Sequence, residues 1–353
     1  MTKTFNVGII GVGTIGKVHA DAYQAIDGIH IGAICDPIPE RLREQGERLG
    51  VAARFTDYRE LLKSDVDAVS ICVGNALHRE VALAALECGK HVLVEKPMAM
   101  NAAEAIEIKD AGEESGKVVQ VAMVRRQATE PQIVRGMVQR GLFGDIYHMR
   151  CVLIRRRGIP GLGGWFTNRA ESGGGPMIDL GVHYFDAAMY VSGLWNPTRV
   201  SAKTYAKFGR DMRSYRYTGM WAGPPKFDGV FDVEDYSTGL IRFADQATMS
   251  FEIAWAANTI EESYIEFLGD KAGARIFDKG PLTLWTEHDE RPADIMPRYA
   301  DLGNPFHAQA RKFLAACRDG EPPAATAEQG VTVMKTIDAV YASSEQDREI
   351  EIG

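Results

Sequence analysis

A glycine-punctuated turn near the start of the chain constrains the fold more than any other feature. Gly11, Gly13 and Gly16 have the spacing G-x-G-x-x-G, after an apolar run at 5–10 and before a helix-like segment. In such a turn the first glycine permits a tight bend, the second lets the backbone approach a pyrophosphate, and the third allows close packing of helix and strand. The motif predicts a strand, a phosphate-binding turn and a helix whose N-terminal amides face the phosphates; a plain flexible turn is the alternative.

An acidic residue at the end of the next apolar run extends this interpretation. The run IHIGAIC (29–35) is typical of a second strand, and Asp36 follows it, 20 positions after Gly16. A carboxylate there accepts hydrogen bonds from the ribose hydroxyls of adenosine and repels a 2′-phosphate. The first arginine after it is Arg41. We therefore expect NAD as the cofactor, with NADP disfavoured; an aspartate that caps a turn is the alternative.

The composition excludes several classes of protein. The chain has 353 residues and a formal net charge of −8, which argues against nucleic acid as the main partner. No apolar stretch approaches the roughly 20 residues of a membrane span, and a predicted strand begins almost at once, so we expect no membrane association and no signal peptide. Five scattered cysteines without a C-x-x-C pair indicate reduced thiols, a cytoplasmic protein and no metal site.

Residues 1–124 alternate strand and helix patterns. The predicted strands cover 66–73, 91–97 and 117–124 in addition to the first two, and the predicted helices cover 38–49, 57–63, 78–90 and 101–115. Strands that alternate with helices imply a parallel, doubly wound sheet. We expect an α/β fold that begins with a Rossmann dinucleotide-binding domain over 1–124.

The pattern changes in residues 125–353. A helix is predicted over 130–140, a long strand over 146–157 and a helix over 178–192, and successive strand-like runs then follow without intervening helices. Such runs predict a large, mostly antiparallel open sheet. Two further helices, at 305–320 and 326–343, complete a C-terminal α+β domain. Since ligands of α/β sheets bind at the carboxyl ends of the strands, we expect the site there, between the two domains.

Two further stretches carry residues suited to chemistry. In GKHVLVEKPMA (89–99), Lys96 follows a predicted strand and lies at the same sheet edge as the glycine turn. In SGGGPMIDLGVHYFD (172–186), Asp179 and His183 are four positions apart on a predicted helix and share one face. The preceding glycines let a ligand or another backbone segment come close. A strand-end lysine and a structural Asp–His pair are the alternatives.

These stretches together resemble the Gfo/Idh/MocA oxidoreductases, which include inositol and glucose–fructose dehydrogenases. The resemblance runs through nearly the whole chain and rests on VGIIGVGTIGKVHADAY, ALHREVALAALECGKHVLVEKPMAMN and GGGPMIDLGVHYFDAAMYVSG. It implies a cis bond between Lys96 and Pro97. The family commonly has T-P-N where this chain has Val73-Gly74-Asn75, so the asparagine is retained without the rigid proline.

The resemblance implies an NAD-dependent dehydrogenase that oxidises a secondary hydroxyl of a cyclic polyol or sugar. By resemblance, His183 is the acid/base, Lys96 holds and polarises the reacting oxygen, and Asp179 orients the sugar hydroxyls or the lysine. The expected cofactor-binding residues are Gly11, Gly13, Thr14, Ile15, Gly16, Asp36, Asn75, His78, Glu95, Lys96 and Arg125. The substrate domain is also expected to build a homodimer or homotetramer through its open sheet face.

Position alone adds further substrate-binding candidates. Arg155, Arg156 and Arg157 end the long strand and enter a glycine-rich loop that contains Trp165. Arginine forks and an aromatic ring could line a polyol pocket, and solvated strand-end charges are the alternative. The expected substrate-binding residues are Lys96, Arg155, Arg157, Trp165, Asp179 and His183.

Two other functions stay open. One is an NAD-dependent glycosidase or lyase that acts through transient oxidation at C3; such enzymes tend to lack the E-K-P lysine and the D-x-x-x-H pair, and this chain has both. The other is a non-catalytic NAD-binding regulator, which the presence of Lys96 argues against. One fold hosts many functions, so the fold alone does not decide.

Overall fold

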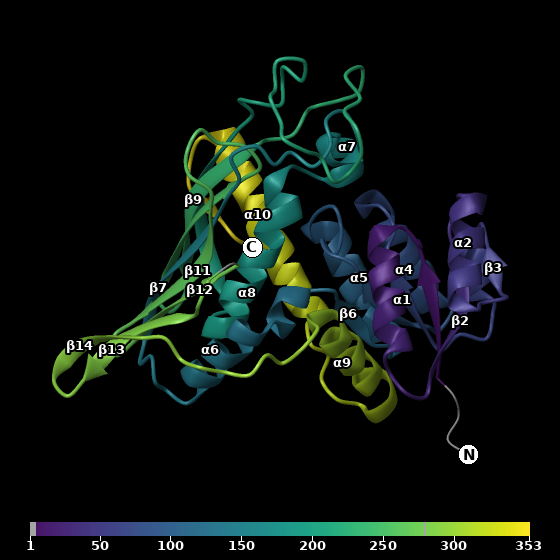
Figure 1. The fold of residues 1–353 in the computed structure, drawn as a ribbon, viewed down its shortest axis with the longest axis horizontal. Coiled ribbons are helices and arrows are strands. Elements are labelled where there is room, and N and C mark those ends of the chain that lie inside the picture. Colours follow the sequence, from purple (N-terminus) through teal and green to yellow (C-terminus); the bar gives the residue numbers. More distant parts are fainter. Residues whose placement is uncertain (1–4, 279) are drawn as a thin grey trace. The chain divides into compact units, whose positions relative to one another are not determined.

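The computed structural model describes residues 5–278 and 280–353, which divide into two compact units (Figure 1). The first unit contains the chain up to Gln127 together with Leu302–Val331, and the second contains Ala128–Asp301 and Thr332–Gly353. The first has a parallel sheet and the second a mostly antiparallel one, which confirms the predicted fold class.

The first unit is built on a six-stranded parallel sheet with the order β3-β2-β1-β4-β5-β6. Its strands are β1 (Phe5–Ile10), β2 (Ile29–Cys35), β3 (Arg54–Phe55), β4 (Ala68–Ile71), β5 (His91–Val94) and β6 (Val119–Val121). Its helices are α1 (Thr14–Gln24), α2 (Pro39–Leu49), α3 (Tyr58–Leu62), α4 (His78–Glu87), α5 (Ala102–Ser115) and α9 (Pro305–Asp319), with short turns η1 (Asn75–Leu77) and η2 (Val124–Gln127). The strand order reverses between β1 and β4, where doubly wound sheets bind their ligands.

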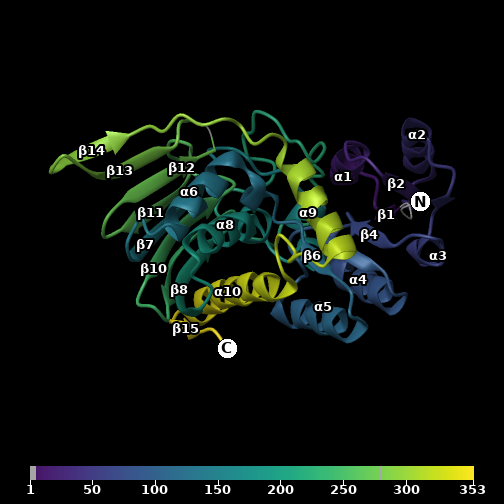
Figure 2. The same cartoon turned by 90° about the horizontal axis from the view of Figure 1, so that it is seen from below.

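The central strands of this sheet are apolar because helices cover both of its faces. All four residues of β4 are buried, as continuous apolar strands of parallel sheets usually are. Figure 2 shows α1 and α9 on one side of the sheet and α4 and α5 on the other.

The segment 302–331 belongs to the first unit although it lies near the C-terminus, whereas the predicted boundary assigns everything after residue 124 to the second domain. Phe313 and Leu314 of α9 pack into the same apolar cluster as Val7 of β1. The Val121 amide at the edge strand β6 donates to the carbonyl of Ala325 (3.1 Å). The returning segment thus covers a sheet edge that would otherwise expose unpaired backbone groups.

The second unit contains a nine-stranded sheet with the order β14-β13-β12-β11-β7-β10-β9-β8-β15. Its strands are β7 (Ile146–Ile154), β8 (Pro197–Tyr205), β9 (Tyr236–Phe243), β10 (Thr248–Ala254), β11 (Glu262–Gly269), β12 (Gly273–Phe277), β13 (Thr283–His288), β14 (Arg291–Ile295) and β15 (Ile350–Glu351). The pair β10–β7 is parallel, and the other pairs with a described register are antiparallel.

Helices pack on one face of this second sheet. They are α6 (Thr129–Gln139), α8 (Val182–Ser192) and α10 (Ala327–Gln346), and the short elements η3 (Trp165–Thr167), α7 (Arg169–Ser172) and η4 (Met177–Gly181) lie in the connections. In the part of the chain that the structure describes, no helix covers the opposite face (Figures 1 and 2). This uncovered face is the one expected to make homo-oligomer contacts, which stays a prediction.

No helix among residues 5–278 and 280–353 combines the length and apolar character needed to cross a membrane. Within the same described residues, no three His, Cys, Asp or Glu side chains gather closely enough to hold a metal ion.

Candidate active site

The three motif glycines have different surroundings, and each matches a different requirement of a phosphate-binding turn. Gly11 has φ = +89°, and a Cβ there would overlap the carbonyl of Cys72. A Cβ on Gly16 would overlap the carbonyl of Gly11. A Cβ on Gly13 would meet only Arg41, 3.8 Å away. The first and third glycines therefore allow tight packing, while the second leaves open space for a ligand.

The helix that follows this turn begins without a side-chain cap. Gly13 is the N-cap of α1 and offers no side chain to the first amides, and Thr14 and Ile15 form the first turn. Uncapped amides and the positive end of the helix dipole favour an anion at this point. The cradle of Gly13 and the start of α1 thus fits the pyrophosphate of NAD.

Asp36 lies where the ribose is expected, and it is already held by the protein. Its buried carboxylate accepts hydrogen bonds from the amides of Val12 (3.1 Å) and Ile38 (3.0 Å). Arg41, in the first turn of α2, approaches Asp36 to 3.2 Å. The helix turns Arg41 back to the end of β2, so this position carries a carboxylate–guanidinium pair, which the sequence spacing did not indicate.

A buried ion pair stands behind the E-K-P motif. His19 of α1 contacts the Glu95 carboxylate through Nε2 (2.9 Å) and the Ser70 hydroxyl through Nδ1 (3.2 Å), and Tyr23 also bonds Ser70 (2.7 Å). Burial lowers the pKa of His19, but the neighbouring Cys72 and Glu95 side chains outweigh burial and raise the pKa to about 10. His19 is therefore protonated at neutral pH and forms a charge pair with Glu95.

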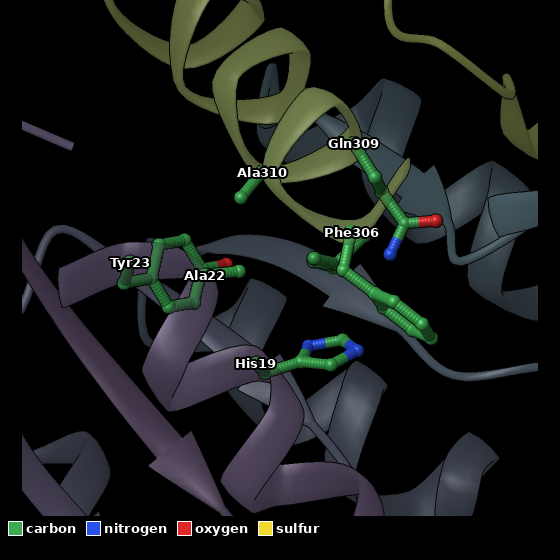
Figure 3. Close-up of a pocket in the computed structure, with 7 residues that line it drawn as sticks. His19, Ala22, Tyr23, Phe306, Gln309 and Ala310 are labelled. Carbon is green, nitrogen blue, oxygen red and sulfur yellow. The ribbon is translucent and has the colours of Figure 1, made fainter. Parts of the chain in front are cut away.

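Figure 3 shows the setting of this pair, with His19 and Tyr23 of α1 facing Phe306 and Ala310 of α9. The gap among these side chains is too narrow to hold a water molecule. The network is therefore sealed from solvent and does not form a ligand pocket.

Lys96 follows this network directly. The second oxygen of Glu95 accepts a hydrogen bond from the Lys96 amide (3.1 Å), and Lys96 itself is half-buried. The bond between Lys96 and Pro97 is cis, as predicted. Glu95 is a predicted cofactor residue, but here both of its oxygens bind protein groups, so it positions the backbone that carries Lys96.

His78 also binds the backbone of this motif. It is buried at the start of α4, with Nδ1 2.7 Å from the Pro97 carbonyl and Nε2 3.2 Å from the Val73 carbonyl. Burial lowers the pKa of His78, and a neutral imidazole has one N–H, which donates to one of these two carbonyls. It is among the predicted cofactor residues, yet both nitrogens already face backbone carbonyls, which indicates a role in holding Pro97.

Two other predicted cofactor residues lie at strand ends of the same sheet. Asn75 is buried in η1, after β4, and Arg125 is half-buried in η2, after β6. The neighbouring Arg126 is fully buried and donates to Ala324 (2.9 Å) and Gln329 (2.6 Å). Arg126 therefore anchors the returning C-terminal segment.

In the second unit, Asp179 and His183 lie across the junction of two helix types. Asp179 is in the π-helical turn η4, and His183 is in the first turn of α8. The predicted single helix over 178–192 is thus interrupted by a wider turn, a feature often found at functional sites. Asp179 is buried, and its carboxylate accepts a hydrogen bond from the indole N–H of Trp255 (3.0 Å).

A second buried carboxylate holds the start of this helix. Glu234 accepts hydrogen bonds from the amides of Gly175 and Met177 (3.1 Å each) and from the Tyr341 hydroxyl (2.9 Å). A Cβ on Gly175 would overlap the Glu234 backbone, and one on Gly174 would overlap Tyr341. The glycine-rich lead-in therefore makes room for protein groups that cap the helix. The negative charge of Glu234 also stabilises the positive N-terminal end of the helix dipole.

The neighbouring Asp235 supports the other side of the same region. It is fully buried and accepts hydrogen bonds from three successive amides, those of Lys207, Phe208 and Gly209. Its own carbonyl accepts from the amide of Trp255 (2.9 Å). The acidic stretch DVEDY (232–236) leads into β9, and the sequence did not indicate that two of its three carboxylates are buried. Glu234 caps the turn before Asp179, and Asp235 binds the Trp255 amide through its backbone carbonyl.

The strand-end arginines have different surroundings. Arg157 donates to the Ala257 carbonyl (3.3 Å) and to Asn258 (2.7 Å), and stacks 4.8 Å from the Phe208 ring centre. Arg156 is exposed. Arg155 is half-buried, and among the described residues its guanidinium has no hydrogen-bond or ion-pair partner. Arg155 is thus more available for a ligand than Arg157.

The structure brings the predicted site residues together in two groups. The glycine turn, Asp36 and Lys96 share the first unit, at the carboxyl ends of β1, β2 and β5. Asp179, His183, Trp165 and the arginines share the second unit.

Comparisons with known proteins match both units. The family model of the oxidoreductase family with an NAD-binding Rossmann fold (GFO_IDH_MocA) covers residues 5–123, and the GFO/IDH/MocA C-terminal domain covers 132–275. A D-glucoside 3-dehydrogenase of Escherichia coli is 34% identical, over 99% of this chain and 98% of that protein. A myo-inositol 2-dehydrogenase of Thermotoga maritima is 26% identical, over 98% of both chains.

Solved structures agree. An oxidoreductase domain protein from Kribbella flavida superposes with a TM-score of 0.87 at 25% identity, covering 99% of both chains. The chain therefore belongs to the GFO/IDH/MocA family of NAD(P)-dependent oxidoreductases, and its first unit is the NAD-binding Rossmann domain.

Proposed function

We propose that this chain is an NAD-dependent dehydrogenase that oxidises a ring secondary hydroxyl of a sugar, with a D-glucoside as the preferred class. The observation that carries the proposal is the full-length match to a D-glucoside 3-dehydrogenase in a chain that has Lys96, Asp179 and His183 at the motif positions.

The first unit supplies a cradle that suits NAD. Gly13 and the uncapped start of α1 suit the pyrophosphate, and Asp36 suits the ribose hydroxyls. When bound, the nicotinamide accepts the hydride that leaves the substrate carbon.

The proton and the developing charge are assigned to side chains. His183 takes the proton of the substrate hydroxyl, since an imidazole has an ordinary pKa near ~6.5 and suits general base catalysis near neutral pH. The ammonium of Lys96 stabilises the negative charge that develops on the oxygen as its proton is removed, and this charge is lost again as hydride leaves the carbon and the carbonyl forms. The carboxylate of Asp179 orients the hydroxyl, and Trp255 fixes that carboxylate through its indole N–H.

The supporting contacts explain why the sequence surrounds these three residues as it does. The His19–Glu95 pair holds the backbone at Lys96, and Glu234 holds the glycine turn before Asp179. Precise placement matters because small displacements of a catalytic group reduce the rate strongly.

The test is a substrate panel with purified protein. Methyl glucosides, free aldohexoses and inositols are incubated with NAD or NADP, NADH formation is followed by absorbance, and the products are identified by mass spectrometry as keto sugars. We expect stoichiometric NADH with glucosides, and a product two hydrogens lighter than the substrate. His183→Asn should abolish this while NAD binding, followed by fluorescence, is retained.

The same panel separates the alternatives. Cleavage of a glycoside without net NADH would indicate the glycosidase or lyase reaction, because there the hydride returns to the sugar. NAD binding without turnover of any sugar would favour a regulator.

A further inference from the structure

A row of aromatic side chains extends from Asp179 to the surface of the second unit. Trp255, which bonds Asp179, lies 6.4 Å from Phe166 between ring centres and at a near-perpendicular angle. The ring centre of Phe166 lies 3.7 Å from that of Trp165 and 4.9 Å from that of Trp221. We call Trp165, Phe166 and Trp221 the aromatic cluster.

The outer members of the aromatic cluster are unusually exposed. Trp255 is fully buried and Phe166 is 9% exposed, whereas Trp165 is 37% and Trp221 is 64% exposed. Large apolar side chains that gather at the surface mark ligand or partner sites more often than chance would give. The exposed rings continue, through direct contacts, to the carboxylate that our proposed function assigns to the sugar.

The loop that carries Trp221 is long but well anchored. Residues 206–235 join β8 to β9 without a helix or strand, and loops of such length are usually functional. Directly after Trp221, the amides of Ala222 and Lys226 donate to the carbonyls of Pro160 (2.9 Å) and Leu162 (2.7 Å). Trp221 is therefore held against the loop that carries Trp165.

Glycines allow this close approach of the two loops. Gly163 has φ = +67°, and a Cβ there would overlap the carbonyl of Lys226. Farther along, the Thr167 hydroxyl donates to the Val230 carbonyl (2.7 Å). The glycine-rich stretch GIPGLGGWF thus joins two loops so that both tryptophans flank Phe166, and this arrangement preorganises a surface for a ligand.

We propose that the aromatic cluster is a second sugar-binding subsite, which stacks the aglycone ring of a glycoside while the first ring is oxidised at Asp179 and His183. This inference rests on the proposed function. The C–H face of a pyranose is apolar and carries partial positive charge, which matches the negative face of an indole. The favoured substrate is thus a disaccharide or aryl glycoside, and a free monosaccharide lacks the second ring.

The test compares glycosides with small and large aglycones. In Trp221→Ala, kcat/KM for a disaccharide and for a phenyl glucoside should fall about 10-fold, while kcat/KM for the methyl glucoside stays within about twofold; tenfold corresponds to about 1.4 kcal/mol. Trp221→Phe should restore most of the loss. Tyr217→Ala is the matched control, since Tyr217 is exposed in the same loop but stacks with Tyr215 and not with the aromatic cluster. It should leave kcat/KM unchanged for all three glycosides.

Binding without turnover keeps this inference separate from the proposed function. Calorimetric titration of the same glycosides should show that the disaccharide binds more weakly to Trp221→Ala than to the wild type, whether or not the wild type forms NADH. If Trp221→Ala weakened the binding of the methyl glucoside and of the disaccharide equally, or of neither, the proposed subsite would be overturned. A change in oligomeric state of Trp221→Ala by light scattering would also overturn it, because Trp221 would then contact a second copy of the chain.

Discussion

The two units support their candidate catalytic residues in different ways. In the first unit, Lys96 follows Glu95, which pairs with a buried, protonated His19. In the second unit, Asp179 accepts a bond from the neutral indole of Trp255, and the turn before it is capped by Glu234. The first is supported by an ion pair between α1 and the end of β5, and the second by a neutral donor and a capping carboxylate that lie far from it in the sequence.

This difference has an energetic consequence. Breaking a buried ion pair leaves an uncompensated charge and reduces the stability of the whole unit. Removing a neutral donor from a carboxylate costs less stability but changes how the carboxylate is held. We therefore expect substitutions behind Lys96 to affect folding and substitutions behind Asp179 to affect turnover.

The largest loss of kcat is expected when Lys96 of the first unit or His183 of the second is replaced. Lys96→Met and His183→Asn should each lower kcat by roughly 10²–10⁴, because one loses the cation at the developing oxyanion and the other the general base. The double variant should lose less than the product of the two, since both act on one transition state. The kcat of each variant is measured from the rate of NADH formation, and NAD binding is checked by fluorescence.

Lys90→Met provides the control for the lysine substitution. Lys90 is also in the first unit and donates to the carbonyls of Ser64 and Val66, so its loss should change stability without changing kcat. A His183→Asn enzyme with normal kcat and pH profile would remove His183 from the chemistry.

The next effect concerns the ion pair. His19→Gln should lower the free energy of unfolding by about 3 kcal/mol at neutral pH, because Glu95 is left buried without its cation. The pKa of His19 is raised in the folded state, so this stabilisation is complete below its ordinary pKa of 6.5 and is lost as pH rises toward about 10. Urea unfolding of the wild type and of His19→Gln near pH 6, 8 and 10 should show that the difference between their free energies of unfolding decreases as the pH rises.

Exposed His288 of β13 offers the matched histidine control. His288→Gln should leave the free energy of unfolding unchanged at each pH. A gap between wild type and His19→Gln that widens with rising pH would contradict the assignment of a protonated His19.

A smaller loss of kcat is expected when the hydrogen bond from Trp255 to Asp179 is removed. Trp255→Phe keeps an aromatic ring but removes the donor, and we expect kcat to fall about 10-fold, as for loss of a hydrogen bond to a charged group worth about 1.5 kcal/mol. Phe251→Leu, which trims a buried ring that meets Phe185 edge-to-face, should cost similar stability and leave kcat unchanged. Equal kcat in the two variants would show that Trp255 only packs.

The smallest effect concerns the cofactor. Asp36→Ser should raise the ratio of kcat/KM for NADP to that for NAD about 10-fold, since it removes a like charge and releases Arg41 to pair with the 2′-phosphate. Adding Arg41→Ala should cancel the gain. A wild-type enzyme that prefers NADP would overturn the role of Asp36.

Much of the first unit was predictable because its constraints are local. The glycine turn, the strand that follows and the E-K-P segment each carry their signal within a few residues, and the family model confirms the NAD-binding Rossmann fold. The backbone conformation of Gly11 and the close approach at Gly16 require glycine wherever such a turn forms. The assignments of individual catalytic and binding residues remain predictions.

The second unit shows what local patterns leave out. Asp179 and His183 were visible as a pair, but Trp255 lies 76 positions from Asp179, and Glu234 lies 59 positions from Gly175. Nothing in the stretch DVEDY distinguishes a solvated acidic lead-in from two buried carboxylates, because burial depends on which loops pack over it. The π-helical turn was hidden for another reason: its five residues make little more than one turn, too few for its wider period to be distinguished from that of an ordinary helix.

The sequence by itself determined the alternating strands and helices of the first unit, the phosphate-binding turn and the lysine, aspartate and histidine of the motifs, since periodicity and special backbone conformations are properties of short segments. Only the tertiary structure decided that 302–331 closes the first sheet, that Arg41 pairs with Asp36, that His19 is charged against Glu95, and that Trp221 meets Phe166. Each of these depends on groups far apart in the chain, whose pairing is set by burial and by the need to satisfy buried charges and amides.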